Sequence, residues 1–335
     1  MGMPTFNKNR LEKVIQRIQD LRILVLGDLM LDQFIYGRVS RISPEAPVPV
    51  VQVTHETAFP GGAANVARNL ADFGVKVGVC GVLGKDNAGE QLAKLLKKSK
   101  IDTKGLFIES RFSTIIKTRI IARHQQVVRV DHEEMLKFRP SEMEQIKSFL
   151  RKELKNYQAV IVEDYGKGFL HQEIFDELVK IAAEQEKVVT VDPNPSNPID
   201  FSGATAVKPN RSEAIAYAGL GGDPEATDMD EVGAALLERW KVPYLLVTMG
   251  DQGMQLYQKF LAPYHTPTRA KEVFDVSGAG DTAISFFTAG LAVGLNGMEA
   301  AELANHAAGV VVSKLGTATL QPEELIESFI GAANE

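Results

Sequence analysis

The chain has 335 residues, of which 44% are hydrophobic, and its formal net charge is −6. This size allows one large α/β domain or two smaller ones, and the lack of a basic excess argues against nucleic-acid binding. The single cysteine, Cys80, excludes an internal disulfide framework and a cysteine-based zinc site. The sequence shows no apolar signal segment and no run long enough to span a membrane. We therefore expect a cytoplasmic protein that binds neither membrane nor nucleic acid.

Short apolar runs alternate with helical patterns along the chain. Residues 21–28 predict a buried strand, and residues 61–74 space their apolar side chains along one helix face. Further strands are predicted at residues 75–82, 157–165, 187–193, 204–210 and 242–250, with helices such as 170–185 between most of them. This alternation predicts a mostly parallel sheet that is covered on both faces. Ligands bind beyond the carboxyl ends of such strands, where this chain has polar residues.

Two regions interrupt the alternation and predict a second, smaller sheet. Residues 33–53 are rich in β-formers and proline, and residues 113–131 alternate polar and apolar side chains. Both patterns are typical of strands with one solvated face. We expect a lid over the main domain, at about residues 33–56 and 108–131. Because an open apolar sheet face tends to find a partner, we also expect a homodimer through the lids.

Near the C-terminus, Gly278-Ala279-Gly280-Asp281 precedes an amphipathic helical pattern. The spacing also fits a dinucleotide-binding turn, but the following residues are helical, so the acid that should end a second strand is missing. Glycines before a helix allow a close approach to phosphate, which the helix N-terminus favours. Asp281 is either an acid placed for the helix dipole or a base that takes a proton from an attacking hydroxyl.

Four separated motifs resemble the ribokinase-like (PfkB) sugar kinases over nearly the whole length. They are "PGGAANVARNLADFG" (60–74), "KPNRSEA" (208–214), "VTMGDQGM" (247–254) and "DVSGAGDTAISFFTAGL" (275–291). The resemblance implies a ribokinase-like three-layer α/β/α fold with a mostly parallel central sheet and a small β-sheet lid. It also implies phosphoryl transfer from ATP to a sugar, with Mg²⁺ and in some relatives a monovalent cation such as K⁺.

A narrower resemblance is to the heptose 7-phosphate kinases of this family. It rests on residues 27–53 and on "RHQQVVRVD" (123–131), "EDYGKG" (163–168) and "AAGVVVSKLGT" (307–317). It implies phosphorylation of D-glycero-β-D-manno-heptose 7-phosphate at C1, on the route to ADP-heptose for lipopolysaccharide. Since the sequence has no His-x-Gly-His motif, we expect a single kinase domain over residues 1–335 without a nucleotidyltransferase. The alternatives are another sugar or nucleoside substrate, such as fructose 1-phosphate or ribose, and a non-catalytic sugar sensor.

Two residues depart from the pattern of the heptose kinases. Asn194 stands where many of them have a lysine, and Glu163 stands where a small residue is common. Both departures bear on the substrate and leave the reaction class unchanged.

The resemblance assigns the substrate to the carboxyl edge of the sheet. Asp32 would accept sugar hydroxyls, while the backbone and an amide would reach the sugar at Gly61, Gly62 and Asn65. Cationic candidates for the substrate phosphate in the lid are Arg41, Lys117, Arg119, Arg123 and Arg129. These either bind phosphate or form a solvated basic face, and a turn expected at 123–126 would separate them. Asp164 and Lys167 either contact the substrate or pair with each other.

The resemblance assigns the nucleotide and the transferred phosphoryl group to the C-terminal half. The anion-binding turn would be Gly278, Ala279 and Gly280, with Asp281 as the base. ATP and its Mg²⁺ would be bound by Asn210, Glu213, Thr248, Gly250, Gly253, Asn305 and Gly316. Lys208 would either approach the ATP phosphates or be a surface lysine.

Overall fold

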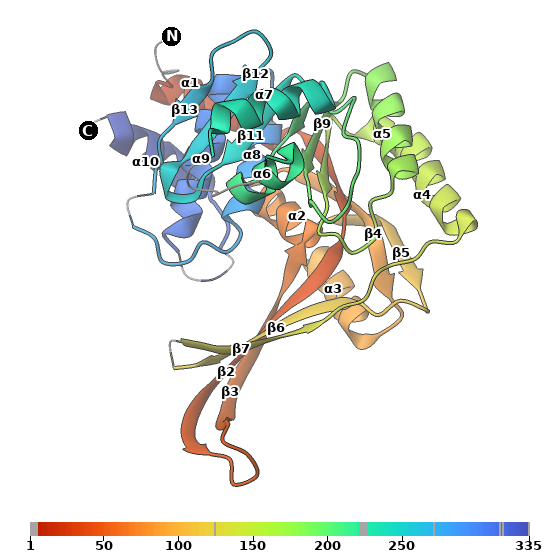
Figure 1. The fold of residues 1–335 in the computed structure, drawn as a ribbon, viewed down its shortest axis with the longest axis vertical. Coiled ribbons are helices and arrows are strands. Elements are labelled where there is room, and N and C mark those ends of the chain that lie inside the picture. Colours follow the sequence, from red (N-terminus) through yellow and green to blue (C-terminus); the bar gives the residue numbers. More distant parts are fainter. Residues whose placement is uncertain are drawn as a thin grey trace.

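The computed structural model describes residues 6–123, 125–220, 227–270, 272–314, 316 and 318–333. They form a body built on one large sheet and a second sheet that projects from it (Figure 1). The expected α/β architecture with a small additional sheet is confirmed.

The large sheet has nine strands in the order β13-β12-β11-β10-β9-β8-β1-β4-β5. All neighbours from β5 to β11 are parallel, whereas β12 and β13 pair antiparallel at one edge. Parallel strands place their carboxyl ends at one edge of the sheet, which gathers the polar residues there. The strands are β1 (Arg22–Gly27), β4 (Lys76–Gly84), β5 (Asp102–Glu109), β8 (Ala159–Glu163), β9 (Val188–Asp192), β10 (Ala206–Val207), β11 (Tyr244–Thr248), β12 (Met254–Gln258) and β13 (Tyr264–Thr266).

Helices cover both faces of this sheet, and each face has its own hydrophobic core. Strand β1 shows why: Ile23 and Val25 belong to one core, while Leu24 and Leu26 belong to the other, because strand side chains alternate. The first core packs against α1 (Lys8–Gln19), α2 (Ala63–Asp72), α3 (Asn87–Lys98), α8 (Ala279–Ala292), α9 (Gly297–Val312) and α10 (Pro322–Ala333). The second packs against α4 (Pro140–Glu153), α5 (Gln172–Glu184), α6 (Arg211–Ala218) and α7 (Met229–Trp240).

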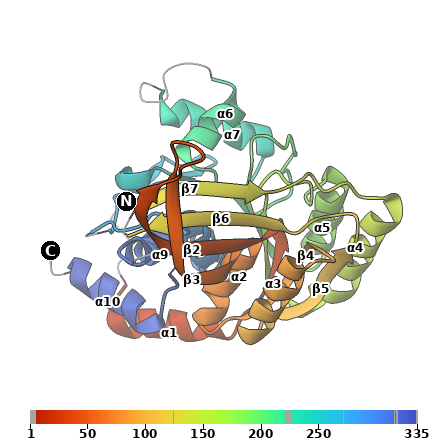
Figure 2. The same ribbon diagram turned by 90° about the horizontal axis from the view of Figure 1, so that it is seen from below.

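The second sheet, called the lid below, has the order β3-β2-β6-β7. Its strands are β2 (Leu29–Ile42), β3 (Pro49–Gly62), β6 (Ile115–Ala122) and β7 (Gln125–His132). Figure 2 shows these strands lying across the body. In this view, α6 and α7 lie above the lid, and α1 and α10 lie below it. The lid begins directly after β1, at Leu29, and returns to the body at α2. Residues 108 and 109, expected in the lid, instead end β5 in the main sheet.

Among the described residues, we find no helix that combines the length and the apolar character needed to span a bilayer.

Candidate active site

Asp281 lies in the first turn of α8 and is held from two distant segments. Its Oδ2 accepts a hydrogen bond from Nδ2 of Asn65 (2.6 Å), and its Oδ1 accepts one from the hydroxyl of Tyr165 (3.1 Å). Asn65 belongs to the first turn of α2. The motifs at residues 60–74 and 275–291 therefore meet at this carboxylate. Gly278 has a φ of 82° at the N-cap of α8, a conformation that glycine adopts without strain. The carboxylate thus contacts side chains outside its own helix.

The surroundings of Asp281 have opposing effects on its ionisation. Burial raises the pKa of Asp281, and the nearby Asp32 raises it further. The hydrogen bonds from Asn65 and Tyr165 and the charge of Lys208 lower this pKa. A carboxylate in such a setting is suited to accept a proton, because its basicity exceeds that of a solvated aspartate while the donors fix its orientation.

Lys208 lies beside the N-terminal turn of α8. Its side chain is only 4% exposed, and its Nζ lies 2.9 Å from Oδ2 of Asp192 at the end of β9. A Cβ at Gly280 would lie 3.6 Å from this Nζ, so the ammonium group is next to the backbone of the glycine turn. The surface-lysine alternative for Lys208 is therefore wrong.

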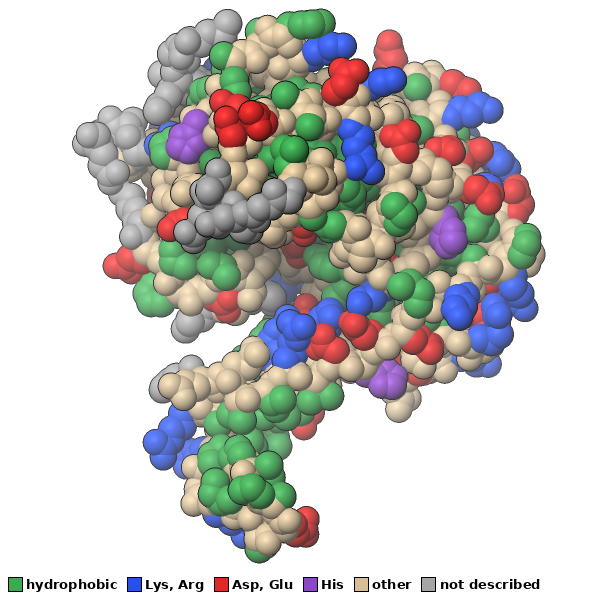
Figure 3. All heavy atoms as spheres, in the orientation of Figure 1, with side chains coloured by type: hydrophobic (Ala, Val, Ile, Leu, Met, Phe, Trp, Pro, Cys, Tyr) green, Lys and Arg blue, Asp and Glu red, His purple; other side chains and the backbone are tan. Residues whose placement is uncertain are grey.

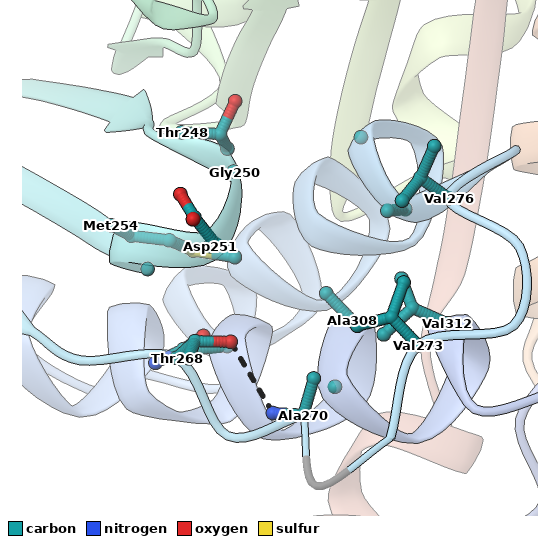
Figure 4. A pocket seen from close by; sticks show the side chains of 15 residues that line it. Thr248, Gly250, Asp251, Met254, Thr268, Ala270, Val273, Val276, Ala308 and Val312 are labelled. Carbon is teal, nitrogen blue, oxygen red and sulfur yellow. Dashed lines mark hydrogen bonds between the residues drawn. The ribbon is translucent and has the colours of Figure 1, made fainter.

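A pocket of about 230 Å³ opens between the β11–β12 turn and helices α8 and α9 (Figure 4). Its walls include six residues expected at the nucleotide or the transferred phosphoryl group: Thr248, Gly250, Gly253, Ala279, Gly280 and Asn305. The apolar part of the wall comes from Val273, Val276, Ala308 and Val312. A pocket that combines apolar walls with polar and glycine residues is suited to a base with a phosphate chain.

Two expected nucleotide residues have other contacts. Nδ2 of Asn305 donates to the hydroxyl of Thr266 (2.8 Å) and to the carbonyl of Pro267 (2.7 Å), so it also fixes the pocket wall. Gly316 has a φ of 73° and donates its backbone N–H to Asp275 (3.2 Å). It is not among the described residues that line the pocket.

Asn210 and Glu213 form a reciprocal capping box at the start of α6. Oδ1 of Asn210 accepts from the N–H of Glu213 (3.0 Å), and Oε2 of Glu213 accepts from the N–H of Asn210 (2.8 Å). Asn210 also bridges to Thr248 of β11, which connects this cap to the pocket. Glu213 is close enough to Asp192 to raise the pKa of that carboxyl. The pair therefore has a structural role, and Glu213 also lies near the carboxylate of Asp192.

The lid contributes a second group of expected residues. Asp32 in β2 forms an ion pair with Arg119 in β6, whose guanidinium stacks over Phe34 at 5.3 Å. A Cβ at Gly61 would overlap the Asp32 carboxylate, so the glycine allows the β3 backbone to pass beside it. Gly62, with a φ of 58°, turns the chain into α2.

Two further lid cations, Lys117 and Arg129, are paired with acids, and so is Lys167 in the loop after β8. Nζ of Lys117 contacts both Asp131 and Glu133 at 3.0 Å, and Lys167 contacts the same Glu133 at 2.7 Å. Arg129 pairs with Asp131 at 3.0 Å. Each cation therefore already has a local anionic partner that a bound phosphate would have to displace or share.

A turn after β6 is confirmed at Arg123, which has a φ of 59°, but Gln125 and Gln126, which were expected in the turn, already belong to β7. Arg123 is therefore separated from the others, whereas Arg119 and Arg129 are directly opposite each other across the hairpin and share one face. Arg41 is exposed near the far end of β2. The lid cations thus form two groups. Lys117, Arg119 and Arg129 lie near the body, whereas Arg41 and Arg123 lie farther out.

Asp164 and Lys167 do not pair with each other, so that alternative is wrong. Asp164 accepts hydrogen bonds from the N–H of Gly166 (2.8 Å) and from Asn197 (2.9 Å). Burial raises its pKa to about 7.

Two residues of the candidate site, Asp28 and Tyr165, were not predicted from the sequence. Asp28 accepts three backbone hydrogen bonds, from Tyr165, Lys167 and Phe169 at 3.0–3.1 Å, and so fixes the loop after β8. Tyr165 is thereby placed against Asp281. A signal was available: Asp28 follows the first strand as the other polar strand ends follow theirs.

A pocket lined by residues expected at the nucleotide, a glycine turn at the start of α8 and an adjacent buried carboxylate together define a phosphotransferase of the ribokinase-like fold. Residues 20–324 match the pfkB family of carbohydrate kinases, and the chain belongs to this family. Membership implies transfer of a phosphoryl group from ATP to a sugar, with a divalent metal.

Two curated relatives illustrate the similarity. The bifunctional protein HldE of Haemophilus influenzae (strain Rd) is 44% identical over 314 residues, which cover 94% of this chain and 64% of the relative. The bifunctional protein HldE of Pelobacter propionicus is 38% identical over 322 residues, which cover 96% of this chain and 66% of the relative. The chain thus spans 64–66% of the length of these two curated relatives.

Solved structures support the fold. Phosphofructokinase-2 from Escherichia coli in complex with potassium has a TM-score of 0.75 at 18% identity, covering 93% of this chain and 99% of that chain. Ribokinase from Arabidopsis thaliana complexed with ribose and ATP has a TM-score of 0.69 at 17% identity, covering 92% and 99%.

Proposed function

We propose that the chain phosphorylates D-glycero-β-D-manno-heptose 7-phosphate at C1 with ATP, giving the 1,7-bisphosphate for ADP-heptose and lipopolysaccharide core synthesis. The observation that carries the kinase chemistry is the Asp281 carboxylate, fixed by Asn65 and Tyr165 next to the glycine turn of α8. The heptose substrate is supported by the HldE relatives and by the lid sequence. We infer one kinase domain that includes the lid.

The nucleotide half follows from the pocket beside α8. ATP would lie along Thr248, Gly250, Gly253 and Asn305, with its γ-phosphate over the N–H groups of Gly278–Gly280. Lys208 would neutralise part of the phosphate charge from its buried position. Oxygen donors at Asn210 and Glu213 fit a Mg²⁺ held mainly by the phosphates, which would supply charge neutralisation. We also propose that the chain uses a K⁺ ion as a second, monovalent cofactor; a phosphofructokinase-2 of similar fold was solved in complex with potassium.

The sugar half lies between the body and the lid. Asp32 would accept sugar hydroxyls, and Gly61 and Gly62 would let the backbone come close to the ring. The 7-phosphate would be bound by Arg119 and Arg129, because guanidinium groups match phosphate oxygens in a bidentate arrangement. Lys117, Lys167, Arg41 and Asp164 are further candidates for contacts with the substrate.

In the reaction, Asp281 would accept the proton of the C1 hydroxyl as that oxygen attacks the γ-phosphorus, while the bond from the γ-phosphorus to the β–γ bridging oxygen breaks and ADP leaves. The hydrogen bonds from Asn65 and Tyr165 would keep the carboxylate aimed at the hydroxyl. The N–H groups at the start of α8 would stabilise the charge on the transferring phosphoryl group.

The proposal is tested with a panel of substrates on the wild-type chain and on Asp281→Asn. We expect kcat/KM for heptose 7-phosphate to exceed that for fructose 1-phosphate and ribose. Asp281→Asn should lose about 10²–10⁴-fold in kcat while ATP still binds, as measured by calorimetry. A better alternative substrate would overturn the heptose assignment. Near wild-type turnover by the variant would overturn the base, and no turnover with any sugar phosphate would favour a sensor.

We also propose that two copies pair through their lids. One face of the lid carries three apolar side chains that are each 45–52% exposed, Val53, Val128 and Val130. Figure 3 shows hydrophobic side chains gathered over this part of the lid. An exposed apolar sheet face of this kind is stabilised by a second copy.

A further inference from the structure

Glu163 ends β8 and is a buried carboxylate that lacks a partner. The residue is 1% exposed, and neither Oε1 nor Oε2 has a hydrogen-bond partner among the described residues. A buried charge without compensation is strongly unfavourable, so a side chain like this either holds a proton or binds a cation. None of the contacts assigned to the kinase chemistry involves the side chain of Glu163.

Two more carboxylates converge on Glu163 from other elements. Ligand oxygens of Glu163, Asp192 and Asp281 all lie within 4.8 Å of one another. They come from the end of β8, the end of β9 and the first turn of α8. Three independent elements thus point oxygen donors into one small volume.

The local charge is unbalanced. If all three carboxylates are ionised they bring three negative charges, and Lys208, paired with Asp192, returns one positive charge. The remainder is two negative charges. Burial and the charges of Asp192 and Asp281 raise the pKa of Glu163 well above its ordinary value, which reflects the same imbalance.

We propose that Glu163, Asp192 and Asp281 bind a hard divalent cation, a site separate from the Mg²⁺ carried by the nucleotide phosphates. Oxygen-only donors select ions such as Mg²⁺, Mn²⁺ and Ca²⁺ over softer metals. Because no two of the three oxygens are more than 4.8 Å apart, one point lies within about 2.8 Å of all of them, close to the ligand distances of about 2.0–2.6 Å that these ions adopt. One divalent ion also balances the two remaining charges.

This cation would act on the base of the proposed reaction. A metal ion beside Asp281 favours the ionised carboxylate and opposes the effect of burial. The proposed site depends on Glu163, because the other two carboxylates have partners without a metal. Asp192 is paired with Lys208, and Asp281 accepts hydrogen bonds from Asn65 and Tyr165.

The site is tested with metal alone, without ATP or sugar, so the outcome does not depend on the proposed function. Free Mn²⁺ is titrated by electron paramagnetic resonance against the wild-type chain, Glu163→Gln and Glu163→Ser. We expect one Mn²⁺ per wild-type chain, displaced by Mg²⁺, and at least a 10-fold loss of affinity in both variants. Glu302→Gln, which neutralises another buried glutamate that is paired with Arg269 and lies outside the cluster, is the matched control and should leave the affinity nearly unchanged.

Thermal unfolding provides a second readout. Added Mg²⁺ should raise the Tm of the wild-type chain, because ligands that bind only the folded state stabilise it. In Glu163→Gln this increase should disappear, although the Tm without metal should equal or exceed that of the wild type. The proposal is overturned if the wild-type chain binds no Mn²⁺ in the absence of nucleotide. Equal affinity in wild type and Glu163→Gln would also overturn it, and would show that Glu163 holds a proton.

Discussion

At the scale of single residues, the orientation of Asp281 depends on side chains that are remote in sequence. Asn65 is 216 positions away and Tyr165 is 116 positions away, yet each donates to one carboxylate oxygen. Tyr165 is in turn placed by Asp28, which accepts its backbone N–H. Helix capping and catalysis are compatible at this position, because the helix start that favours an acid also favours a phosphoryl group.

Tyr165→Phe tests this positioning. The hydrogen bond from Tyr165 lowers the pKa of Asp281, so its removal should raise that pKa. Since the base must be ionised, activity increases with pH through this pKa, and the acidic limb of the kcat–pH profile should move to higher pH. At the plateau, we expect only a several-fold loss in kcat, in line with one hydrogen bond of about 1 kcal/mol. If the acidic limb of the kcat–pH profile of Tyr165→Phe matched that of the wild type under excess Mg²⁺, Tyr165 would have only a packing role.

At the scale of elements, the start of α6 combines a capping box with a proposed metal-positioning role. Both side chains of the box, Asn210 and Glu213, are occupied in reciprocal hydrogen bonds. A cap alone accounts for the sequence pattern, whereas the proximity of Glu213 to Asp192 does not follow from capping. Substitutions that preserve the cap can separate the two roles.

Glu213→Gln should retain the cap, because glutamine also serves at the third helical position, and should therefore leave the Tm nearly unchanged. Asn210→Ala should lower the free energy of unfolding by about 1 kcal/mol. If Glu213 positions the nucleotide metal, Glu213→Gln should also raise several-fold the Mg²⁺ concentration that gives half-maximal rate. An unaltered Mg²⁺ dependence would reduce Glu213 to a capping residue.

At the scale of the whole molecule, the lid has two faces with different properties. Arg119 and Arg129 are opposite each other on one face, where Asp32 also lies. Val128 and Val130, which flank Arg129 along β7, point to the other face and are exposed. The polar face is directed to the proposed substrate, and the apolar face is available for a second copy.

Val130→Lys should convert the proposed dimer into a monomer, because a lysine in an apolar interface loses its hydration without a partner. Ile108→Lys is the matched control: Ile108 is 58% exposed at the end of β5 in the main sheet, away from the lid strands. Sedimentation velocity at micromolar concentration distinguishes the species. A monomeric wild-type chain, or a Val130→Lys chain that stays dimeric, would contradict pairing through this face.

Much of the fold was predictable because it depends on local patterns. The run at residues 21–28 became β1, and the apolar face of residues 61–74 became α2. The lid strands extend beyond the expected limits, from Leu29 to Gly62, because β2 continues from β1 with only Asp28 between them. Element boundaries of this kind are set by pairing with neighbouring strands rather than by the sequence pattern.

The sequence by itself determined the α/β class, the lid, the glycine turn and the identity of Asp281 as an acid at a helix start. Only the tertiary structure decided that Lys208 is buried, that Asp164 and Lys167 have different partners, and that Tyr165 contacts Asp281. It also decided that Glu163, Asp192 and Asp281 meet. The physical reason is range: periodicity and capping act between neighbours along the chain, whereas the carboxyl ends of parallel strands bring together residues whose spacing in sequence carries no signal.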